Sequence, residues 1–493
     1  MKKALGIDIG TTGIKAVLVT EEGKVVAFEK REQHQSFPIP GWCEQDGNEI
    51  LNLCIESCKT LLKKTKTNPD EVSCFGLDHQ GESCLVWDKA TGKPLYPVIT
   101  WQDRRMAKAS EQFEKENPGV ITKITGLRSD SYYSAWKIRW ILDNIPNGQE
   151  RAQNGEILAG TLNTWIIWNL TGGASFVTDD SSSAVMMLCN PREGSYDPWL
   201  LNSLNIPRCL LPEIAPCNSV LGIIKSDIFG HEIPITCSLV DCSAGIFASG
   251  GATKGELTVT YGTGNFLHLI TGDSFIEPLK GLTSACSFKT TTYKLYQLNG
   301  ICYTAGSAIK WLRNGLGIIE DDTETQVLAE SVPDTAGVFF VPALNGLATP
   351  YWDQSACGAF LGITAATKKA HFVRAVLESS ALQVANCCDI MREVSKIEPT
   401  CINAMGGMTA NSFLMQLQSD LSGIEVSLPT QTEPCYGSAC MALSGVGAKF
   451  TNDDIKTLNP SIKRYYPRMS KSHREEKINA WLDAVQRITC WNH

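Results

Sequence analysis

The chain has 493 residues, which is too long for one hydrophobic core, so we expect two large domains. Its composition, with 43% hydrophobic and 19% charged residues, is ordinary for a globular enzyme. A net charge of −8 without any block of Lys or Arg argues against nucleic acid or an anionic membrane surface as the main partner. No apolar run is long enough to cross a bilayer, and the first ten residues are not typical of a secretion signal.

The chain contains 19 cysteines, a high number, but no Cys-x-x-Cys pair. Most of them lie inside apolar segments, where cysteine behaves as a small hydrophobic residue. A disulfide framework or a metal site would need a more regular spacing. The sequence therefore predicts a reduced, cytoplasmic enzyme.

The first eighty residues alternate between apolar strands and polar turns. LGIDIG and IKAVLVT flank a Gly-Thr-Thr-Gly turn, which is typical of a β-hairpin. In NEILNLCIESCKTLLKK the apolar residues recur at helical spacing, and SCFGLDHQG is a buried strand that ends in polar residues. We expect strands at 5–10, 14–20, 24–32 and 73–81, and a helix at 48–64.

A similar strand-turn-strand unit, ELTVTYGTGNFLHLIT, occurs half a chain later and indicates two related lobes. The repeat is imperfect, because Asp8 in the first copy corresponds to Thr260 in the second. A stretch of small residues at 249–256 is the expected boundary between domains 1–250 and 251–493. In the second half we expect helices at 371–394, 410–421 and 474–488.

The two Gly-Thr turns can bind phosphate. A tight turn lets backbone N–H groups and Thr hydroxyls approach phosphate oxygens closely. Asp8, just before the first turn, can hold Mg²⁺ through water. For one such turn a plain β-hairpin is the simpler interpretation, but a turn at the head of each half favours phosphate binding.

Asp241 follows the apolar run IPITCSLV and has two interpretations. Asp is a preferred helix N-cap, and a helix is expected to begin here. A carboxylate at the end of a strand can also act as the general base for a substrate hydroxyl in phosphoryl transfer. The spacing does not decide between these two roles, which are compatible.

Gly406 and Gly407 precede a predicted helix and place Asn411 in its first turn, which suits nucleotide docking at a helix N-terminus. A simple loop is the alternative. The sequence has no Walker loop, no His-Glu-x-x-His motif and no convincing Gly-x-Gly-x-x-Gly. A P-loop ATPase, a zinc hydrolase and a dinucleotide dehydrogenase are therefore disfavoured.

Several segments together resemble the FGGY carbohydrate kinases. GIDIGTTGIKAVL is similar to the family's first phosphate motif, and the segments at 132–144 and 358–378 fit its two signatures. Within the family, the sequences of further segments and their order along the chain are most similar to the glycerol kinase branch. These segments are VWDKATGKPLYPVITWQDRR, TYGTGNF, AGSAIKWLRN, PALNGLATPYWD and NSFLMQLQSD. The resemblance covers nearly the whole chain.

The resemblance implies an α/β fold of two ribonuclease H-like domains of the actin/hexokinase type, with ATP and a small polyol or sugar bound in the cleft between them. It implies ATP and Mg²⁺ as cofactors, Asp241 as the catalytic base, and Asp8 and Asp241 near the metal. A homodimer or homotetramer is also expected. The positions implied to contact the nucleotide are Thr11, Thr12, Lys15, Gly262, Thr263, Gly306, Lys310, Gly407 and Asn411. Those implied to contact the acceptor are Gln80, Glu82, Trp101, Tyr132, Asp241, Cys242 and Phe266. Without the resemblance, ordinary core packing would be the default interpretation of the three aromatic residues.

Two positions depart from the glycerol kinase pattern. Gly81 stands where that branch carries Arg, and Cys242 stands where it carries Gln. Both replacements are smaller, so we expect a longer polyol or a ketose as acceptor, with glycerol as the alternative. A non-catalytic ATP-binding module of the same fold is a third hypothesis, which the retention of Asp8 and Asp241 argues against.

Overall fold

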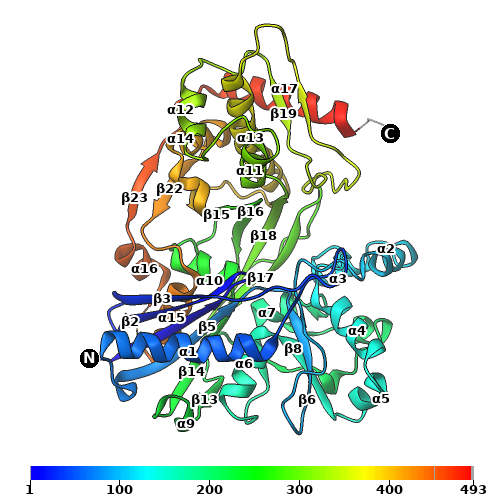
Figure 1. The fold of residues 1–493 in the computed structure, drawn as a ribbon, viewed down its shortest axis with the longest axis vertical. Coiled ribbons are helices and arrows are strands. Elements are labelled where there is room, and N and C mark those ends of the chain that lie inside the picture. The colour runs from blue at the N-terminus through cyan, green and yellow to red at the C-terminus, as the bar shows by residue number, and fades with distance from the viewer. Residues whose placement is uncertain (1, 449, 490–493) are drawn as a thin grey trace.

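The computed structural model describes residues 2–448 and 450–489, which form two lobes stacked along the long axis of the molecule (Figure 1). Residues 490–493 of the predicted second domain lie outside the described part. Each lobe is built around one large mixed β-sheet with helices packed on it, as the sequence predicted. None of the helices in the described part combines the length and hydrophobicity that a bilayer crossing requires.

The first lobe contains a six-stranded sheet, in the order β13-β14-β5-β1-β2-β3. β1 pairs with β2 in antiparallel and with β5 in parallel orientation, and β5 pairs in parallel with β14. Side chains on both faces of the central strands are buried, which explains their nearly continuous apolar sequence. The strands are β1 (Lys3–Ile9), β2 (Gly13–Thr20), β3 (Val25–Glu32), β5 (Val72–His79), β13 (Gly222–Ile224) and β14 (Ile233–Val240).

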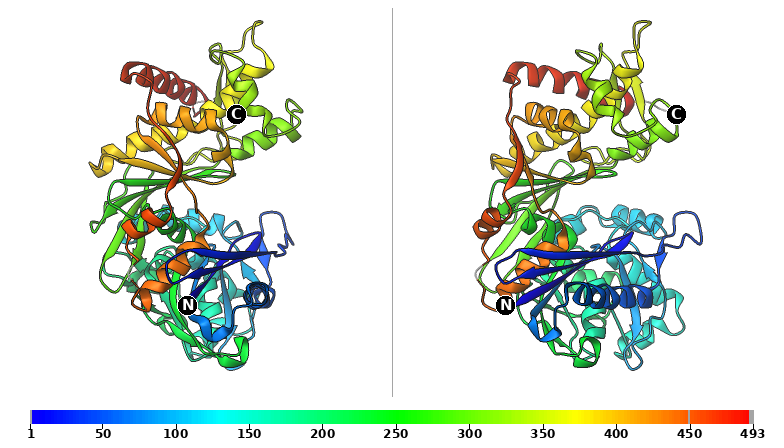
Figure 2. Two further views of the ribbon diagram at one scale, coloured as in Figure 1. Left: turned by 90° about the vertical axis from the view of Figure 1, so that its left-hand side faces the viewer. Right: turned by 60° about the vertical axis from the view of Figure 1, so that its left-hand side comes forward.

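Helices cover both faces of this sheet. α1 (Gly47–Thr65) and α6 (Leu162–Leu170) pack on one face, and α10 (Asp241–Ala248) and α15 (Pro434–Gly445) pack on the other. α15 comes from the far end of the chain, and Figure 2 shows it in orange among the elements of the first lobe. It approaches β1 so closely that a Cβ on Gly6 would lie 2.1 Å from the carbonyl oxygen of Cys435. The domain boundary near residue 250 stays a prediction, and α15 crosses it in space.

The second lobe repeats this topology in a seven-stranded sheet, in the order β17-β18-β16-β15-β21-β22-β23. β15 pairs with β16 in antiparallel and with β21 in parallel orientation, as β1 does with β2 and β5. The predicted relation between the two lobes is thus confirmed. The strands are β15 (Glu256–Tyr261), β16 (Asn265–Gly272), β17 (Thr283–Lys289), β18 (Lys294–Cys302), β21 (Cys401–Met405), β22 (Glu425–Pro429) and β23 (Ser461–Tyr465).

The predicted helices are present with small shifts at their ends. The segment at 371–394 belongs to a longer buried helix, α13, and the segment at 474–488 belongs to α17. The segment at 410–421 begins two residues later than expected, because Asn411 caps the helix instead of lying inside it. The helices of this lobe are α11 (Gly306–Asn314), α12 (Glu324–Glu330), α13 (Lys369–Ser395), α14 (Ser412–Ser422) and α17 (Lys471–Thr489), whereas α16 (Asn452–Leu458) packs on α10 of the first lobe.

A four-stranded sheet, in the order β4-β7-β6-β8, forms a smaller unit beside the first lobe. Its apolar cluster is separate from the main one and includes Ile99, Trp136 and Ile138. The loops at its edge hold predicted acceptor residues. Its elements are β4 (Glu44–Gln45), β6 (Cys84–Asp88), β7 (Val98–Ile99), α2 (Ala107–Glu116), α3 (Val120–Thr125), α4 (Ser134–Asn144), α5 (Gly148–Gln153) and β8 (Ile157–Thr161).

Short elements connect these layers. They are β9 (Val177–Asp179), α7 (Asp180–Ala184), β10 (Cys189–Asn190), β11 (Ser195–Tyr196), α8 (Pro198–Ser203), β12 (Glu213–Ala215), α9 (Ser226–Phe229), β19 (Phe339–Val341) and β20 (Ala359–Leu361).

Candidate active site

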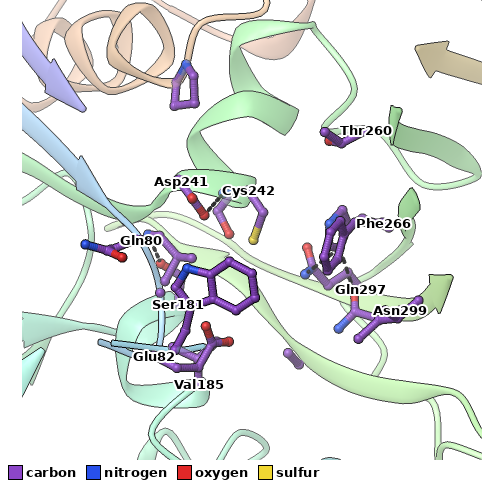
Figure 3. Close-up of a pocket in the computed structure, with 18 of the residues that line it drawn as sticks. Gln80, Glu82, Ser181, Val185, Asp241, Cys242, Thr260, Phe266, Gln297 and Asn299 are labelled. Atoms are coloured by element: carbon purple, nitrogen blue, oxygen red, sulfur yellow. Dashed lines mark hydrogen bonds between the residues drawn. The ribbon is translucent and has the colours of Figure 1, made fainter. Parts of the chain in front are cut away.

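A cavity of about 500 Å³ lies between the two lobes, and side chains from both sheets line it (Figure 3). From here on it is called the central cavity. Most of the predicted site residues meet in it. They are Asp8, Thr11, Lys15, Gln80, Glu82, Trp101, Tyr132, Asp241, Cys242 and Phe266.

The parallel strands of the first lobe explain why Asp8 and Asp241 meet in the cavity, with a third carboxyl group, Asp78, buried beside Asp8. β1, β5 and β14 run in the same direction, so their carboxyl ends meet at one edge of the sheet. Asp8 and Asp78 are direct partners in the register of β1 and β5, and Asp241 follows the last residue of β14. Asp78 was not among the predicted site residues.

Burial dominates the electrostatics of these carboxyl groups. It raises the pKa of Asp8 to about 6, although the nearby Lys15 lowers it. It raises the pKa of Asp241 to about 8, with further contributions from the charges of Asp8 and Glu82. Burial and the charge of Asp8 also raise the pKa of Asp78 well above its ordinary value. Three such groups cannot all be ionised cheaply without a cation, so the site is suited to binding one.

Asp241 is the first residue of α10, and Val240 is the N-cap residue. The N-cap interpretation is therefore wrong by one position, and the Asp241 side chain is available to the cavity. One of its oxygens, Oδ1, accepts a hydrogen bond of 2.6 Å from the backbone N–H of Cys242. The other oxygen remains for a ligand. A carboxylate held in this way can accept a proton from a bound hydroxyl.

A wall of aromatic and acidic side chains faces Asp241. The Trp101 indole N–H donates to Thr11 Oγ1 at 2.9 Å, and the Trp101 and Tyr132 rings meet edge to face with centroids 5.9 Å apart. Glu82 lies beside them, and burial raises its pKa to about 7 although Lys137 lowers it. Apolar ring faces next to carboxylate acceptors are suited to the C–H surface and the hydroxyls of a polyol.

A buried polar network below the cavity positions the end of β14. Asp179 accepts hydrogen bonds from the hydroxyls of Ser181 and Ser182. Ser181 Oγ accepts the Val240 backbone N–H at 3.0 Å, and Ser182 Oγ lies 2.9 Å from His79 Nε2. The network connects the residue before Asp241 with the residue before Gln80. Motif reasoning missed it, because these polar residues are far apart in the sequence.

Lys15, a predicted nucleotide contact, forms an ion pair with Glu433. Partial burial lowers the pKa of Lys15, but its hydrogen bond and charge interaction with Glu433 outweigh this effect, so the pKa is raised overall. Both side chains line the central cavity and remain about one-third exposed. The lysine is therefore accessible to a phosphate but has a competing partner.

A second cavity of about 400 Å³ lies in the second lobe, and all the remaining predicted nucleotide contacts except Thr12 line it. At Gly306, the first residue of α11, a Cβ would lie 2.6 Å from the carbonyl oxygen of Gly262, so only glycine allows this close approach. The turn at Gly262 and the beginning of α11 are thereby held close together. The predicted residues in this second cavity are Gly262, Thr263, Gly306, Lys310, Gly407 and Asn411.

Two predicted residues have other positions or roles than expected. Asn411 caps α14, because its Oδ1 accepts the Leu414 N–H at 3.0 Å. Thr12 lies at the exposed tip of its turn and lines neither of the two cavities. The assignment of both residues to the nucleotide stays a prediction.

Besides the predicted Phe266, the second lobe adds lining residues that the sequence analysis did not single out. Phe266 and His268 project from β16 toward the central cavity, and Gln297, Asn299 and Ile301 project from β18. Alternate residues of a strand point to the same face, so one side of each strand contributes them. The available signal was the alternation of Gln297 and Asn299 with apolar residues in YQLNG.

Comparison with protein families matches both halves of the chain. Residues 3–248 match the N-terminal domain of the FGGY family of carbohydrate kinases, and residues 257–445 match its C-terminal domain. The glycerol kinase 2 of Thermotoga maritima is 41% identical over 493 residues, which cover 100% of this chain and 99% of that protein.

Solved structures share the architecture. The glycerol kinase of Plasmodium falciparum, solved with ADP, has a TM-score of 0.95 and 31% identity, covering 100% of this chain and 99% of that one. A xylulose kinase from Lactobacillus acidophilus has a TM-score of 0.89 at 22% identity over 99% of both chains, which is a likeness of fold. The chain belongs to the FGGY family of carbohydrate kinases, and it is accordingly an ATP-dependent phosphotransferase.

Proposed function

We propose that the protein transfers the terminal phosphoryl group of ATP to a hydroxyl of a small polyol or sugar bound in the central cavity. One observation carries the proposal: Asp241 lies in this cavity together with the wall of Glu82, Trp101 and Tyr132. The second cavity supplies the expected room for the nucleotide. The phosphate chain then extends toward Asp8 and the Gly10–Gly13 turn.

In this mechanism Asp241 is the general base. It accepts the proton of the acceptor hydroxyl while the hydroxyl oxygen forms a bond to the γ-phosphorus. The bond between that phosphorus and the oxygen bridging to the β-phosphate breaks, and the electron pair leaves with ADP. Lys15, Thr11 and the backbone N–H groups of the first turn are placed to stabilise the negative charge on the transferred group.

The residues around Asp8 fit a hard divalent cation. Asp8 and Asp241 line the cavity with raised pKa values, the buried Asp78 pairs with Asp8 in the sheet register, and Lys15 lies near Asp8. In the part of the chain that the structure describes, no three such side chains are arranged to hold a metal by themselves. This suits Mg²⁺, which retains water and is bound through one or two carboxylates and the phosphates of the substrate. We propose that Asp8 and Asp241 hold it, where it would neutralise phosphate charge.

The proposed acceptor is a polyol or ketose longer than glycerol. Gly81 contributes no side chain beside the acceptor wall, and a Cβ there would already lie 3.2 Å from a methyl group of Val240 and 3.7 Å from one of Val185. Cys242 adds a small thiol, whose pKa burial and the charge of Asp241 raise. It is therefore neutral at pH 7 and carries no charge toward the acceptor.

Glycerol is the second candidate acceptor, and a specific observation favours it. The 41% identity to the Thermotoga maritima glycerol kinase 2 extends over the whole chain. That similarity supports placing the chain in the glycerol kinase branch of the family. It carries less weight for the acceptor, because the two departures at Gly81 and Cys242 both lie at the acceptor end.

A panel of acceptors distinguishes the candidates. Purified enzyme with MgATP is assayed for ADP formation with glycerol, four- to seven-carbon polyols, and ketoses, and the phosphorylated product is identified by mass spectrometry and NMR. We expect acceptor-dependent ADP formation, with kcat/KM higher for at least one longer acceptor than for glycerol. ADP release that is independent of every acceptor would contradict the proposal.

The cellular location and the oligomeric state stay predictions. A cytoplasmic location agrees with the cysteines, which are all free in the described residues. A homodimer or homotetramer is expected from the family resemblance. Sedimentation velocity of the purified protein measures the assembly directly.

A further inference from the structure

Three strands of the second lobe place a row of uncharged polar side chains at the end of the central cavity. In the sheet register His268 of β16 lies opposite Asn299 of β18, which lies opposite Thr283 of β17. Gln297 lies two residues from Asn299 on the same face. We call His268, Thr283, Gln297 and Asn299 the polar wall, and all four line the central cavity.

The hydrogen bonds within the polar wall cannot all be made at once. His268 Nδ1 lies 3.0 Å from Asn299 Oδ1 and 3.3 Å from Gln297 Nε2. If Nδ1 carries the proton it donates to Asn299 and cannot accept from Gln297; if it does not, the reverse holds. Within residues 2–448 and 450–489, the buried Gln297 Oε1 has no hydrogen-bond partner. At least two polar atoms are therefore left without a partner in either tautomer.

Leaving buried polar atoms unpaired is costly, and proteins seldom do so without a ligand or water to satisfy them. Gln297 is 4% exposed and His268 is 8% exposed, so bulk water does not easily compensate. Figure 3 shows Gln297 and Asn299 close to Phe266, across the cavity from Asp241 and Glu82. Gln297 and Asn299 thus line the same space as the proposed acceptor, although the unpaired Gln297 Oε1 itself is buried away from the open cavity.

The position of the polar wall matches an acceptor longer than three carbons. The pair of His268 and Asn299 is displaced from the pair of Phe266 and Ile301 by two residues along the antiparallel strands, a step of about 6.7 Å. With C–C bonds near 1.5 Å, the ends of a three-carbon chain are only about 2.5 Å apart. A chain of five or six carbons spans about 5–6 Å by the same bond length and reaches from Phe266 toward the wall.

The charges around the cavity select against an anionic acceptor. Burial lowers the pKa of His268, although its hydrogen bond with Asn299 raises it, so the imidazole is neutral at pH 7. Among the described lining residues Lys15 is the single lysine or arginine, and it is paired with Glu433. Asp8, Glu82 and Asp241 add acidic groups. A carboxylate or phosphate on the acceptor would find no cation at the polar wall.

We infer that the polar wall is a subsite for the far end of an elongated, uncharged acceptor, a polyol or ketose of about five or six carbons. The inference rests on the proposed function and adds to it the residues that recognise the tail. Gln297 and Asn299 hydrogen-bond the hydroxyls beyond the third carbon. The reacting end stays between Asp241, Glu82 and Trp101, so one acceptor contacts both lobes.

The test compares acceptors in two variants. Gln297→Met keeps the side-chain length but removes both hydrogen-bonding atoms, and Asn299→Ala removes a second polar group without adding volume. For each variant and for the unmodified enzyme, kcat/KM is measured with glycerol, xylitol, xylulose, sorbitol and gluconate. We expect the ratio of kcat/KM for the best longer acceptor to that for glycerol to fall about tenfold in either variant, the effect of one lost hydrogen bond. Gluconate, as an anion, should be a worse acceptor than sorbitol.

Gln418→Met is the matched control. Gln418 is also a fully buried glutamine of the second lobe, its amide donates to the Ala381 carbonyl oxygen, and it lines neither cavity. The acceptor ratio should stay within twofold of the unmodified enzyme, and thermal melting checks the folding of each variant. If the ratio is unchanged in both folded polar-wall variants, or if gluconate exceeds sorbitol, the subsite is refuted while the kinase assignment stands. If no acceptor stimulates ADP formation by the unmodified enzyme, the proposed function itself fails.

Discussion

The two lobes use the same backbone arrangement for different chemistry. In the first, β1 and β5 run in parallel and place Asp8 beside Asp78 just before the Gly10–Gly13 turn. In the second, β15 and β21 run in parallel and place Thr260 beside Met405 just before the second turn. Equivalent positions of a repeated topology therefore carry a carboxyl pair in one lobe and uncharged side chains in the other.

This difference indicates a division of labour across the cavity. The first lobe supplies the ionisable groups that the reaction requires, including Asp241 at the end of β14. The second lobe supplies glycine turns and, to the central cavity, neutral polar groups, while Lys310 lines its own cavity proposed for the nucleotide. Since like charges on both sides would repel each other and the triphosphate, keeping carboxyl groups on one side favours closure of the lobes on the substrates.

The strongest test of this division removes the proton acceptor. Asp241→Asn keeps the size of the side chain, and we expect kcat to fall by about 10²–10⁴ with little change in ATP binding. Nucleotide affinity is measured by calorimetry and kcat by ADP formation with the best acceptor. The control is Asp227→Asn, on the exposed surface of α9, which should retain full activity. A folded Asp241→Asn enzyme with near-normal kcat would show that another group acts as base.

The pH dependence tests the same carboxyl group without mutation. The free protein holds a proton on Asp241 up to about pH 8 because burial, then Asp8 and Glu82, raise the pKa. Bound cations favour the carboxylate, so with saturating MgATP we expect kcat/KM for the acceptor to rise with pH and to level off at or below pH 8. Below the plateau the slope is about tenfold per pH unit. A rate that falls between pH 6 and 8 contradicts this assignment.

The same pKa has a consequence for stability. In the unfolded chain the Asp241 carboxyl keeps its ordinary pKa of 3.8, whereas the folded state retains the proton to about pH 8. Between these values the unfolded state binds fewer protons, so the free energy of unfolding decreases as pH rises. In the absence of ligands, Tm should therefore be lower at pH 8 than at pH 6. Asp241→Asn should reduce this difference.

A paired substitution compares the two turns directly. Asp8→Asn removes one carboxylate near the proposed metal, and we expect a loss of about 10–100-fold in kcat/KM that added Mg²⁺ partly restores. Thr260→Val, at the equivalent position of the second lobe, should cost less than about fivefold, the worth of one neutral hydrogen bond. Equal losses in the two variants would contradict the division of labour. The Mg²⁺ titration separates a metal effect from a folding defect.

The sequence predicted the fold, because the fold depends on local patterns, whereas the roles of the site residues stay predictions. The two strand-turn-strand units, the long helices and the strand that precedes Asp241 are visible as apolar runs bounded by glycine or polar residues. The family resemblance then assigned roles to residues that are distant in the sequence. All of the predicted positions except Thr12 line one of the two cavities.

Long-range register determines what the sequence did not reveal. Asp78 becomes significant only because β5 lies beside β1 with Asp78 opposite Asp8. Glu433 reaches Lys15 because α15 returns to the first lobe from the end of the chain. The N-cap interpretation of Asp241 was wrong by one residue, an error that helix-boundary patterns cannot avoid.

The acceptor end can be changed toward the glycerol kinase pattern. Gly81→Arg with Cys242→Gln restores the two side chains expected in that branch, the first of them beside Val185 and Val240. We expect the ratio of kcat/KM for glycerol to that for the best longer acceptor to rise about tenfold, equivalent to one or two hydrogen bonds gained by glycerol. The single variant Cys242→Ser is the control, since it adds little reach. An unmodified enzyme that already prefers glycerol would contradict the assignment to a longer acceptor.

The smallest expected effect concerns the ion pair between Lys15 and Glu433. Glu433→Gln removes a negative charge from the cavity and releases Lys15 for the triphosphate, so KM for ATP should decrease. Because both side chains are about one-third exposed, the change should be less than about fivefold.

Lys15→Met should instead raise KM for ATP, since it removes the cation itself. Their double variant separates the two roles: if Glu433 acts only by holding Lys15, Glu433→Gln has no further effect in the Lys15→Met background. A raised KM for ATP in Glu433→Gln alone would mean that the pair positions the lysine for the nucleotide and does not compete with it.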